Sequence, residues 1–198
     1  SRSGSDIEAA LPDLPYGTFV EYYLDASGDS TTAQVPPGGF TNPLSLYVGG
    51  VLDLDLCNDF EADDGGYTSE LLAGEDREGA NDWQWGQPGG RGGDPDFAYS
   101  GSNAWGNDLG NDAEGRWNGQ YQNNRHNRIT SPTLTFPEHL EGVFLRYARW
   151  LHVEDGFYDS AQILADGEVV WSNHDSQREE GGEHHQDGRW VQHSVDLG

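Results

Sequence analysis

Residues 161–172 read Ala-Gln-Ile-Leu-Ala-Asp-Gly-Glu-Val-Val-Trp-Ser, and this stretch decides the class of the fold. Two runs, residues 161–165 and 168–172, flank the pair Asp166-Gly167. An Asp-Gly pair between two such runs is a strong short-range signal for a β-hairpin, because both turn positions require positive φ. The stretch therefore predicts two antiparallel strands joined by a two-residue turn.

Similar strand signals occur on both sides of this hairpin. Residues 143–153 predict a long strand, residues 190–197 predict another, and residues 18–26 and 44–48 predict two strands that can pair. Helical periodicity is hard to find, and its clearest candidate is residues 6–10. The sequence therefore predicts an all-β protein, and the fold class we expect is a β-sandwich.

The segment around residue 50 predicts a domain boundary. Gly49-Gly50 separates two differently composed segments, so we divide the chain into residues 1–50 and residues 51–198. Residues 51–57 alternate leucine with aspartate, which is typical of a half-buried strand. Long loops rich in Gly, Asn and Asp are expected at residues 63–79, 86–96, 106–127 and 173–188, and such loops often form binding surfaces.

The composition limits the classes of function. The 198 residues include 35 acidic and 10 basic side chains, which gives a net charge of −25, and lysine does not occur. This charge repels a phosphate backbone, so nucleic-acid binding is not expected. It attracts cations, although an acidic surface also serves solubility or adaptation to salt. Seven Trp, nine Tyr and seven Phe supply enough apolar area for a core.

The chain has the features of a processed, secreted protein. It contains no methionine, so we expect that Ser1 arises by processing or excision. No signal peptide and no long apolar stretch is present, and we expect no membrane span. Cys57 is the single cysteine, which excludes an internal disulfide and a zinc site built from cysteines.

Several short blocks occur in order along the chain. They are Asp59-Phe60-Glu61, Asp82-Trp83-Gln84-Trp85-Gly86, Ser100-Gly101 with Ala104-Trp105-Gly106, Ser131-Pro132, Trp150 with Glu154 and Tyr158-Asp159, and a late Trp190. Each block alone is common, but their order and spacing together resemble the MAM-like jelly-roll domain. That domain belongs to secreted bacterial metallopeptidases of the immune inhibitor A type and to other large extracellular proteins. The resemblance covers residues 57–198 and implies a jelly-roll β-sandwich.

The two ends of the chain depart from this pattern. Residues 16–50 are similar to the last two strands of an immunoglobulin-like or fibronectin-like domain, which often precedes such modules. The family's jelly roll continues beyond the strand that matches residues 191–197, whereas this sequence stops at Gly198. We expect the open edge to be filled by a missing C-terminal segment, by a partner chain, or by the N-terminal 50 residues.

The resemblance also implies a bound cation. In the family a cation near the Asp-Phe-Glu strand joins it to the strand before the Tyr-Asp block, which makes Glu61 and Asp159 the first candidates. Asp59, Asp82 and Glu154 come next. Calcium prefers roughly six to eight oxygen ligands, and these carboxylates lie beside expected turns. The alternative is that they are ordinary solvated acids in a chain that contains 35 of them.

Catalytic chemistry finds less support. No His-Glu-x-x-His occurs, and Glu183-His184-His185 lies in a glycine-rich acidic loop, so surface histidines are favoured over a zinc site. Glu154 with Asp155 or Asp159 stays open as a carboxylate pair for glycoside hydrolysis, because sequence spacing does not fix the distance between carboxyl groups. The common motifs of serine hydrolases and nucleotide-binding enzymes are missing.

Aromatic residues form the candidate ligand site. Sugar rings stack on aromatic faces, and the residues that could provide a platform are Trp83, Trp85, Trp105, Trp117 and Tyr121. The structural alternative is that these rings close the two sheets over the core. Of the five, Trp117 and Tyr121 are expected to be the exposed ones.

The sequence thus predicts a non-catalytic extracellular module, stabilised by calcium, that targets a secreted peptidase or adhesin to a protein or carbohydrate. Two alternatives stay open. The chain is a carboxylate-based hydrolase or a processed part of a metallopeptidase, or it is a structural subunit that a partner's strand completes.

Overall fold

The computed structural model describes residues 2–3, 6–7, 10–28, 31–36, 38–41, 43–49, 57–111, 117–136, 142–173 and 184–198. The predicted strand at residues 51–57 lies outside these residues except for Cys57, and so does most of the predicted loop at residues 173–188. Cys57 is a free, exposed thiol.

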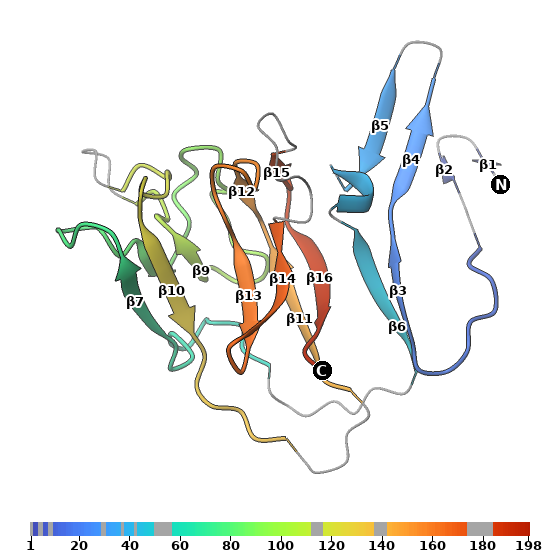
Figure 1. Ribbon diagram of the computed structural model, residues 1–198. Coiled ribbons are helices and arrows are strands. Elements are labelled where there is room, and N and C mark those ends of the chain that lie inside the picture. The colour runs from blue at the N-terminus through green and yellow to red at the C-terminus, as the bar shows by residue number, and fades with distance from the viewer. Residues whose placement is uncertain are drawn as a thin grey trace.

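The described chain is all-β (Figure 1). The N-terminal part contains β1 (Arg2–Ser3), β2 (Asp6–Ile7), β3 (Thr18–Tyr22), β4 (Leu24–Ser27), β5 (Thr32–Val35), the short 3-10 helix η1 (Gly39–Thr41) and β6 (Leu44–Val48). The remainder contains β7 (Thr68–Ala73), β8 (Trp83–Gly86), β9 (Ala104–Asn107), β10 (His126–Thr130), β11 (Phe144–Arg149), β12 (His152–Val153), β13 (Gln162–Ala165), β14 (Glu168–Ser172), β15 (His185–Gln186) and β16 (Val191–Asp196). The strands form antiparallel pairs, consistent with a β-sandwich.

The predicted hairpin is confirmed. Strands β13 and β14 pair, and the turn between them has φ of 49° at Asp166 and 91° at Gly167. Both positive angles are those that a tight hairpin turn needs, which explains the Asp-Gly pair. The predicted pairing of residues 18–26 with residues 44–48 is confirmed for β3, which pairs with β6. Residues 24–27 instead form β4, which pairs with β5 within the expected connection.

The long strand predicted at residues 143–153 is interrupted. It divides into β11 and β12, with Trp150 and Leu151 between them. The backbone N–H of Leu151 donates to Asp187 Oδ2 at 2.8 Å, and its carbonyl accepts from the Asp187 N–H at 2.9 Å. Leu151 therefore pairs with a single residue that supplies both side-chain and backbone partners.

Other predictions about single elements were wrong. The candidate helix at residues 6–10 begins with β2, not with a helix. The expected loop at residues 63–79 contains β7, which pairs with β10 at the end of another expected loop. In β10 the half-buried positions are Asn127 and Ile129, between exposed His126, Arg128 and Thr130. One of the two inward positions is polar, which conceals the alternation of a strand.

The N-terminal strands stand to one side of the others, and β6 lies beside β16 (Figure 1). Phe19 stacks on Phe144 of β11 with ring centroids 5.5 Å apart, and Tyr47 lies 4.8 Å from the same ring. Ser45 Oγ donates to the carbonyl of Ser194 and accepts from its N–H. The N-terminal segment thus contacts β11 and β16. That it fills the open edge stays a prediction, because β16 forms a strand ladder with β11 and β6 forms one with β3.

The interior of the described chain is rich in polar groups. Its buried apolar residues are Ala80, Ala98, Leu109, Val153 and Val195, together with Pro36, Pro88 and Pro95. The buried polar residues are as numerous, namely Asp82, Asp108, Arg149, Asp155, Asn173, His185, Asp187 and His193. Buried polar groups must be hydrogen-bonded, so specific pairs rather than apolar contact alone hold this fold together.

Two loops cross where only glycine fits. The Gly89 N–H donates to the Leu109 carbonyl at 2.6 Å, and a Cβ atom on Gly89 would overlap the carbonyl of Gly110. Gly92 has φ of 68°, and a Cβ atom there would overlap the carbonyl of Gly119. Backbone therefore meets backbone at both crossings, which ties the loop after β8 to the loop after β9.

Candidate functional site

The Asp-Phe-Glu block lies in an exposed loop built from consecutive Asx turns. Asn58 Oδ1 accepts the Phe60 N–H at 2.7 Å, and Asp59 Oδ1 accepts the Glu61 N–H at 3.1 Å. Phe60 has φ of 60°, a conformation that few non-glycine residues adopt. Asp63 and Asp64 make the same turn with Gly65 and Gly66. Short acidic side chains thus fix the backbone of residues 58–66 locally.

Glu61 and two tryptophans connect this loop to β8 and β9. Glu61 Oε1 accepts the N–H groups of Ser102 and Asn103, both at 2.8 Å. The Trp85 indole N–H donates to the Phe60 carbonyl at 2.9 Å, and the Trp105 indole N–H donates to the Asp64 carbonyl at 3.0 Å. These indoles therefore anchor the loop backbone as well as pack against it.

Asp82 is fully buried at the start of β8. Its Oδ1 accepts the side-chain amides of Asn107 at 2.9 Å and Asn127 at 2.6 Å, and its Oδ2 accepts the Gln122 N–H at 2.8 Å. The Asp82 carbonyl also accepts the Asp108 N–H at 2.7 Å. Asp82 thereby connects β8 to β9, to β10 and to the loop before β10.

Asp159 and Glu154 meet Tyr121 at the loop after β12. Tyr121 Oη donates to Asp159 Oδ2 at 2.6 Å and accepts the Glu154 N–H at 3.4 Å. Burial, together with the hydrogen bond to Asp159, raises the pKa of Tyr121 to about 12. Asn173 Nδ2, which is fully buried, donates to the Asp159 carbonyl at 2.9 Å. Tyr121 is therefore a half-buried anchor and Asp159 its acceptor.

The predicted cation ligands thus fall into separate groups. Asp59 and Glu61 belong to the Asp-Phe-Glu loop, whereas Glu154 and Asp159 share Tyr121. Glu61 accepts from Ser102 and Asn103, and Asp159 accepts from Tyr121, so a cation shared by Glu61 and Asp159 stays a prediction. Within the described part of the chain, no three His, Cys, Asp or Glu side chains are grouped to hold a metal ion.

A second buried acid, Asp108, organises the loop that carries Trp117. Its Oδ1 accepts the Gly110 N–H at 3.1 Å, and its Oδ2 accepts the N–H groups of Asn118 at 3.1 Å and Gln120 at 3.3 Å. Trp117 is only partly exposed, whereas Trp85 is 39% exposed. Burial, together with the charge of Asp108, raises the pKa of Asp94 to about 6. Asp108 could not be identified from the sequence, because Asp-Leu-Gly is a common combination in loops.

A polar cluster lies on the inner face of β11 and β16. The Arg149 guanidinium forms a bidentate ion pair with the Asp187 carboxylate, and both N···O distances are 2.9 Å. It also lies 5.2 Å from the ring centre of Trp171 on β14. Burial, together with the charge of Arg149, lowers the pKa of His193 to about 4, and the Tyr147 ring lies 5.9 Å from the His193 ring. His193 is therefore neutral at neutral pH.

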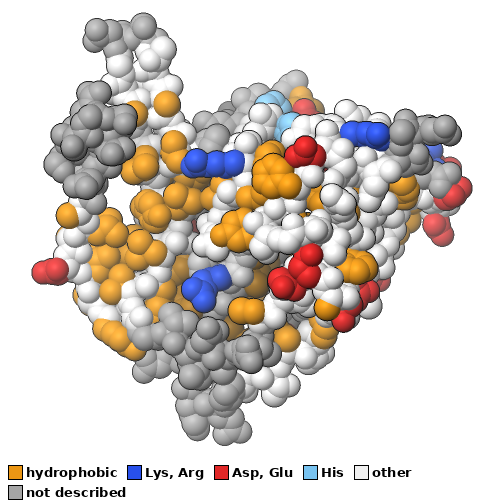
Figure 2. Space-filling view, turned by 180° about the vertical axis from the view of Figure 1, so that it is seen from behind, with side chains coloured by type: hydrophobic (Ala, Val, Ile, Leu, Met, Phe, Trp, Pro, Cys, Tyr) orange, Lys and Arg blue, Asp and Glu red, His pale blue; other side chains and the backbone are white. Residues whose placement is uncertain are grey.

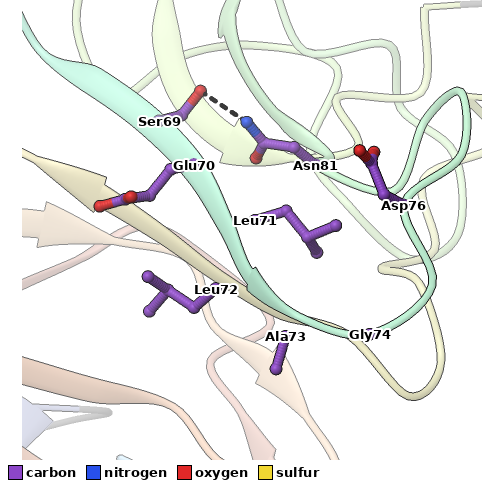
Figure 3. A pocket seen from close by; sticks show the side chains of 8 residues that line it. All are labelled: Ser69, Glu70, Leu71, Leu72, Ala73, Gly74, Asp76 and Asn81. Atoms are coloured by element: carbon purple, nitrogen blue, oxygen red, sulfur yellow. Dashed lines mark hydrogen bonds between the residues drawn. The ribbon is translucent and has the colours of Figure 1, made fainter.

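An open hollow of about 530 Å³ runs along β7 (Figure 3). Residues 69–74, Asp76 and Asn81 line it, and the Asn81 side-chain amide donates to Ser69 Oγ at 3.0 Å. Its walls come mainly from one strand, and none of the predicted site residues lies in it. The hollow is thus separate from the groups of carboxylates described above.

Hydrophobic side chains gather on the side of the molecule that carries the N-terminal strands, as the view from behind shows (Figure 2). No helix of the described residues is long and apolar enough to cross a membrane.

No protein-family model, curated protein or solved structure matches this chain.

Proposed function

We propose that this chain is a non-catalytic extracellular module, a calcium-stabilised MAM-like jelly roll that targets a secreted peptidase or adhesin to its ligand. The observation that carries the proposal is the use of the carboxylates. Glu61, Asp82, Asp108 and Asp159 each accept hydrogen bonds from a different loop or strand. Such acids hold separate segments of the chain together, whereas a catalytic acid must meet a substrate.

Calcium binding is proposed for the Asp-Phe-Glu loop. The exposed side chains of Asp59 and Glu61 each use one named oxygen in a hydrogen bond, Oδ1 and Oε1 respectively. Their second oxygens are of the hard, anionic type that calcium prefers. The loop backbone is already fixed by its own turns and by Trp85, so binding a cation orders little additional chain. Glu154 and Asp159 are the second choice.

A turnover assay tests the non-catalytic part of the proposal. Purified chain is incubated with soluble polysaccharides and with casein, and new reducing ends and new amino termini are measured. We expect no turnover by the chain itself. The proposal fails if turnover occurs and if Glu154→Gln or Asp159→Asn abolishes it without changing the melting curve.

A calcium titration followed by calorimetry tests the cation separately. We expect Tm to rise with calcium, because a ligand that binds only the folded state adds about 2.7 kcal/mol at a concentration of 100 Kd. Glu61→Gln is expected to remove most of the rise, whereas Glu168→Gln, an exposed acid of β14, is expected to leave it unchanged. If neither calcium nor a chelator changes Tm, the calcium part of the proposal is wrong.

A further inference from the structure

We propose that four aromatic side chains at one end of β11 and β16 form a binding site for a neutral polysaccharide. They are Phe97, Tyr99, Trp150 and Trp190, referred to below as the aromatic cluster. The inference rests on the proposed function, because it names the class of ligand that the non-catalytic module holds. Its residues differ from Trp117 and Tyr121, the two that the sequence suggested for a ligand.

The two tryptophans meet at the end of a strand ladder. Arg149 of β11 is opposite Val191 of β16, so the next residues outward in this register are Trp150 and Trp190. Their ring centroids are 6.1 Å apart with an interplanar angle of 77°. A rigid antiparallel pair therefore supplies the base of the cluster.

The loop after β8 adds the two outer rings. Phe97 packs edge-on against Trp150 at 6.2 Å and 88°, and Tyr99 packs against Trp190 at 6.4 Å and 68°. The order of contacts is therefore Phe97, Trp150, Trp190, Tyr99. Edge-to-face geometry of this kind is the favourable arrangement for aromatic rings.

The loop is fixed in place before any ligand arrives. The Trp190 indole N–H donates to the Phe97 carbonyl at 2.9 Å, and the Ala98 side chain between the two outer rings is only 6% exposed. The Gly90 N–H donates to the carbonyl of Pro95 at 3.0 Å. Rigid aromatic side chains lose little conformational entropy when they bind, so this loop is suited to recognition.

The exposed part of the cluster is small. Phe97 is 56% exposed and Tyr99 is 51% exposed, whereas both tryptophans are partly buried beneath them. An aromatic side chain offers roughly 150–250 Å², so two half-exposed rings present on the order of 200 Å². A stable protein interface takes about 800 Å² from each partner. The cluster therefore suits a few sugar rings better than a folded protein or a second copy of the chain.

The polar surroundings favour an uncharged, hydroxyl-rich ligand. Exposed Asp96 precedes Phe97, and exposed Arg189 precedes Trp190. A pyranose ring presents a C–H face that stacks on an aromatic ring and hydroxyl groups that a carboxylate and a guanidinium can bind. The net charge of −25 opposes polymers rich in uronate or sulfate.

Affinity electrophoresis of the full chain tests the proposal. Native gels contain hydroxyethylcellulose, glucomannan or soluble starch as neutral probes, and alginate as the anionic probe. We expect at least one neutral polymer to retard the chain and alginate not to do so. Tyr99→Ala and Phe97→Ala are each expected to weaken that association about tenfold or more, since buried aromatic anchors dominate binding.

Two further variants control for folding and for surface aromatics in general. Tyr99→Phe keeps the ring and is expected to bind nearly as the unaltered chain does. Tyr16→Ala removes a side chain that is 73% exposed outside the aromatic cluster, and it is expected to leave retardation unchanged. If Tyr99→Ala fails to fold, tryptophan fluorescence of the unaltered chain is measured instead while the same polymer is added, and we expect the fluorescence to change. No such change would then count against the site.

The outcomes separate this inference from the proposed function. Absence of retardation by every neutral polymer overturns the inference and leaves the non-catalytic, calcium-stabilised module intact. Equal retardation of Tyr99→Ala also overturns it. Binding to casein that depends on Tyr99 assigns the cluster to a protein ligand and overturns it as well. Shortening of the retarded polymer during the assay overturns the non-catalytic function but supports the site.

Discussion

Asp82 and Asp187 are both buried carboxylates, but different groups stabilise their negative charges. Asp187 lies on the inner face of β11 and β16, where the Arg149 guanidinium meets both of its oxygens. Asp82 lies between β8, β9 and β10, where the described donors are two Asn amides and one backbone N–H. One region balances the charge with a cation, and the other balances it with dipoles.

The difference bears on what each region tolerates. Removing one member of a buried ion pair leaves a full charge without its partner, which is strongly destabilising. Removing a carboxylate surrounded by neutral donors leaves only unpaired N–H groups, which cost less. The inner face is therefore expected to be the more fragile of the two regions toward single substitutions.

The largest effect is expected from Arg149→Met. This change leaves the Asp187 carboxylate, which is 4% exposed, without its cation and should lower the free energy of unfolding by about 3–5 kcal/mol. Urea unfolding measures the loss. The double variant Arg149→Met with Asp187→Leu is expected to lose less than the single one, and an equal or greater loss would contradict the ion-pair account.

Asp82→Leu is expected to have the next largest effect. It leaves the three donors without their acceptor and should lower the free energy of unfolding by about 2–4 kcal/mol. Asp82→Asn keeps one acceptor oxygen and should cost less. If Asp82→Asn proves as stable as the unaltered chain in urea, then the negative charge contributes nothing through its hydrogen bonds.

His193 adds a pH dependence to the inner face. Its pKa falls from an ordinary 6.5 to about 4, so between these values only the unfolded chain binds the proton. The stability that neutral His193 provides is thus complete above about pH 6.5 and is lost as the pH falls toward 4. Between about pH 7 and about pH 4.5 the free energy of unfolding, measured in urea, is expected to fall less in His193→Gln than in the unaltered chain, by up to about 3 kcal/mol.

Asp94 provides a control with the opposite sign. Burial and the charge of Asp108 raise its pKa to about 6, so near pH 5 the folded chain binds the proton and the unfolded chain does not. Its contribution to stability therefore falls as the pH rises through this range. On acidification the free energy of unfolding should therefore fall more in Asp94→Asn than in the unaltered chain, whereas it should fall less in His193→Gln.

Ser45→Ala is expected to have the smallest effect. The hydroxyl bridges the N–H and carbonyl of Ser194, and its removal should cost about 1 kcal/mol. Thermal melting measures the change, with Ser27→Ala in exposed β4 as the matched control. A loss no greater than that of the control would show that the rings around Phe144 hold the N-terminal strands without help.

The accuracy of the sequence-based predictions follows from how local each signal is. The Asp166-Gly167 turn was predicted correctly because two adjacent residues determine it. Strand β10 was missed because Asn127, at an inward position, hides the alternation, and its partner Asp82 is 45 residues away. Strand β7 was missed because one of its two half-buried positions is the polar Ser69. The candidate carboxylates were named from the chain, but their use as acceptors depends on N–H groups from distant loops. The exposed pair Phe97 and Tyr99 was missed because its base, Trp150 and Trp190, is brought together only by strand pairing.

The glycine crossings determine where this protein can vary. A Cβ atom on Gly89, Gly92 or Gly119 would overlap a backbone carbonyl, and Gly110 has φ of 69°, so any other residue at these positions must displace or strain the loops that surround Asp108. The loop after β8 also carries Phe97 and Tyr99. Random mutagenesis followed by selection for ligand binding should therefore retain glycine at positions 89, 92, 110 and 119, although none of the four is part of the aromatic cluster.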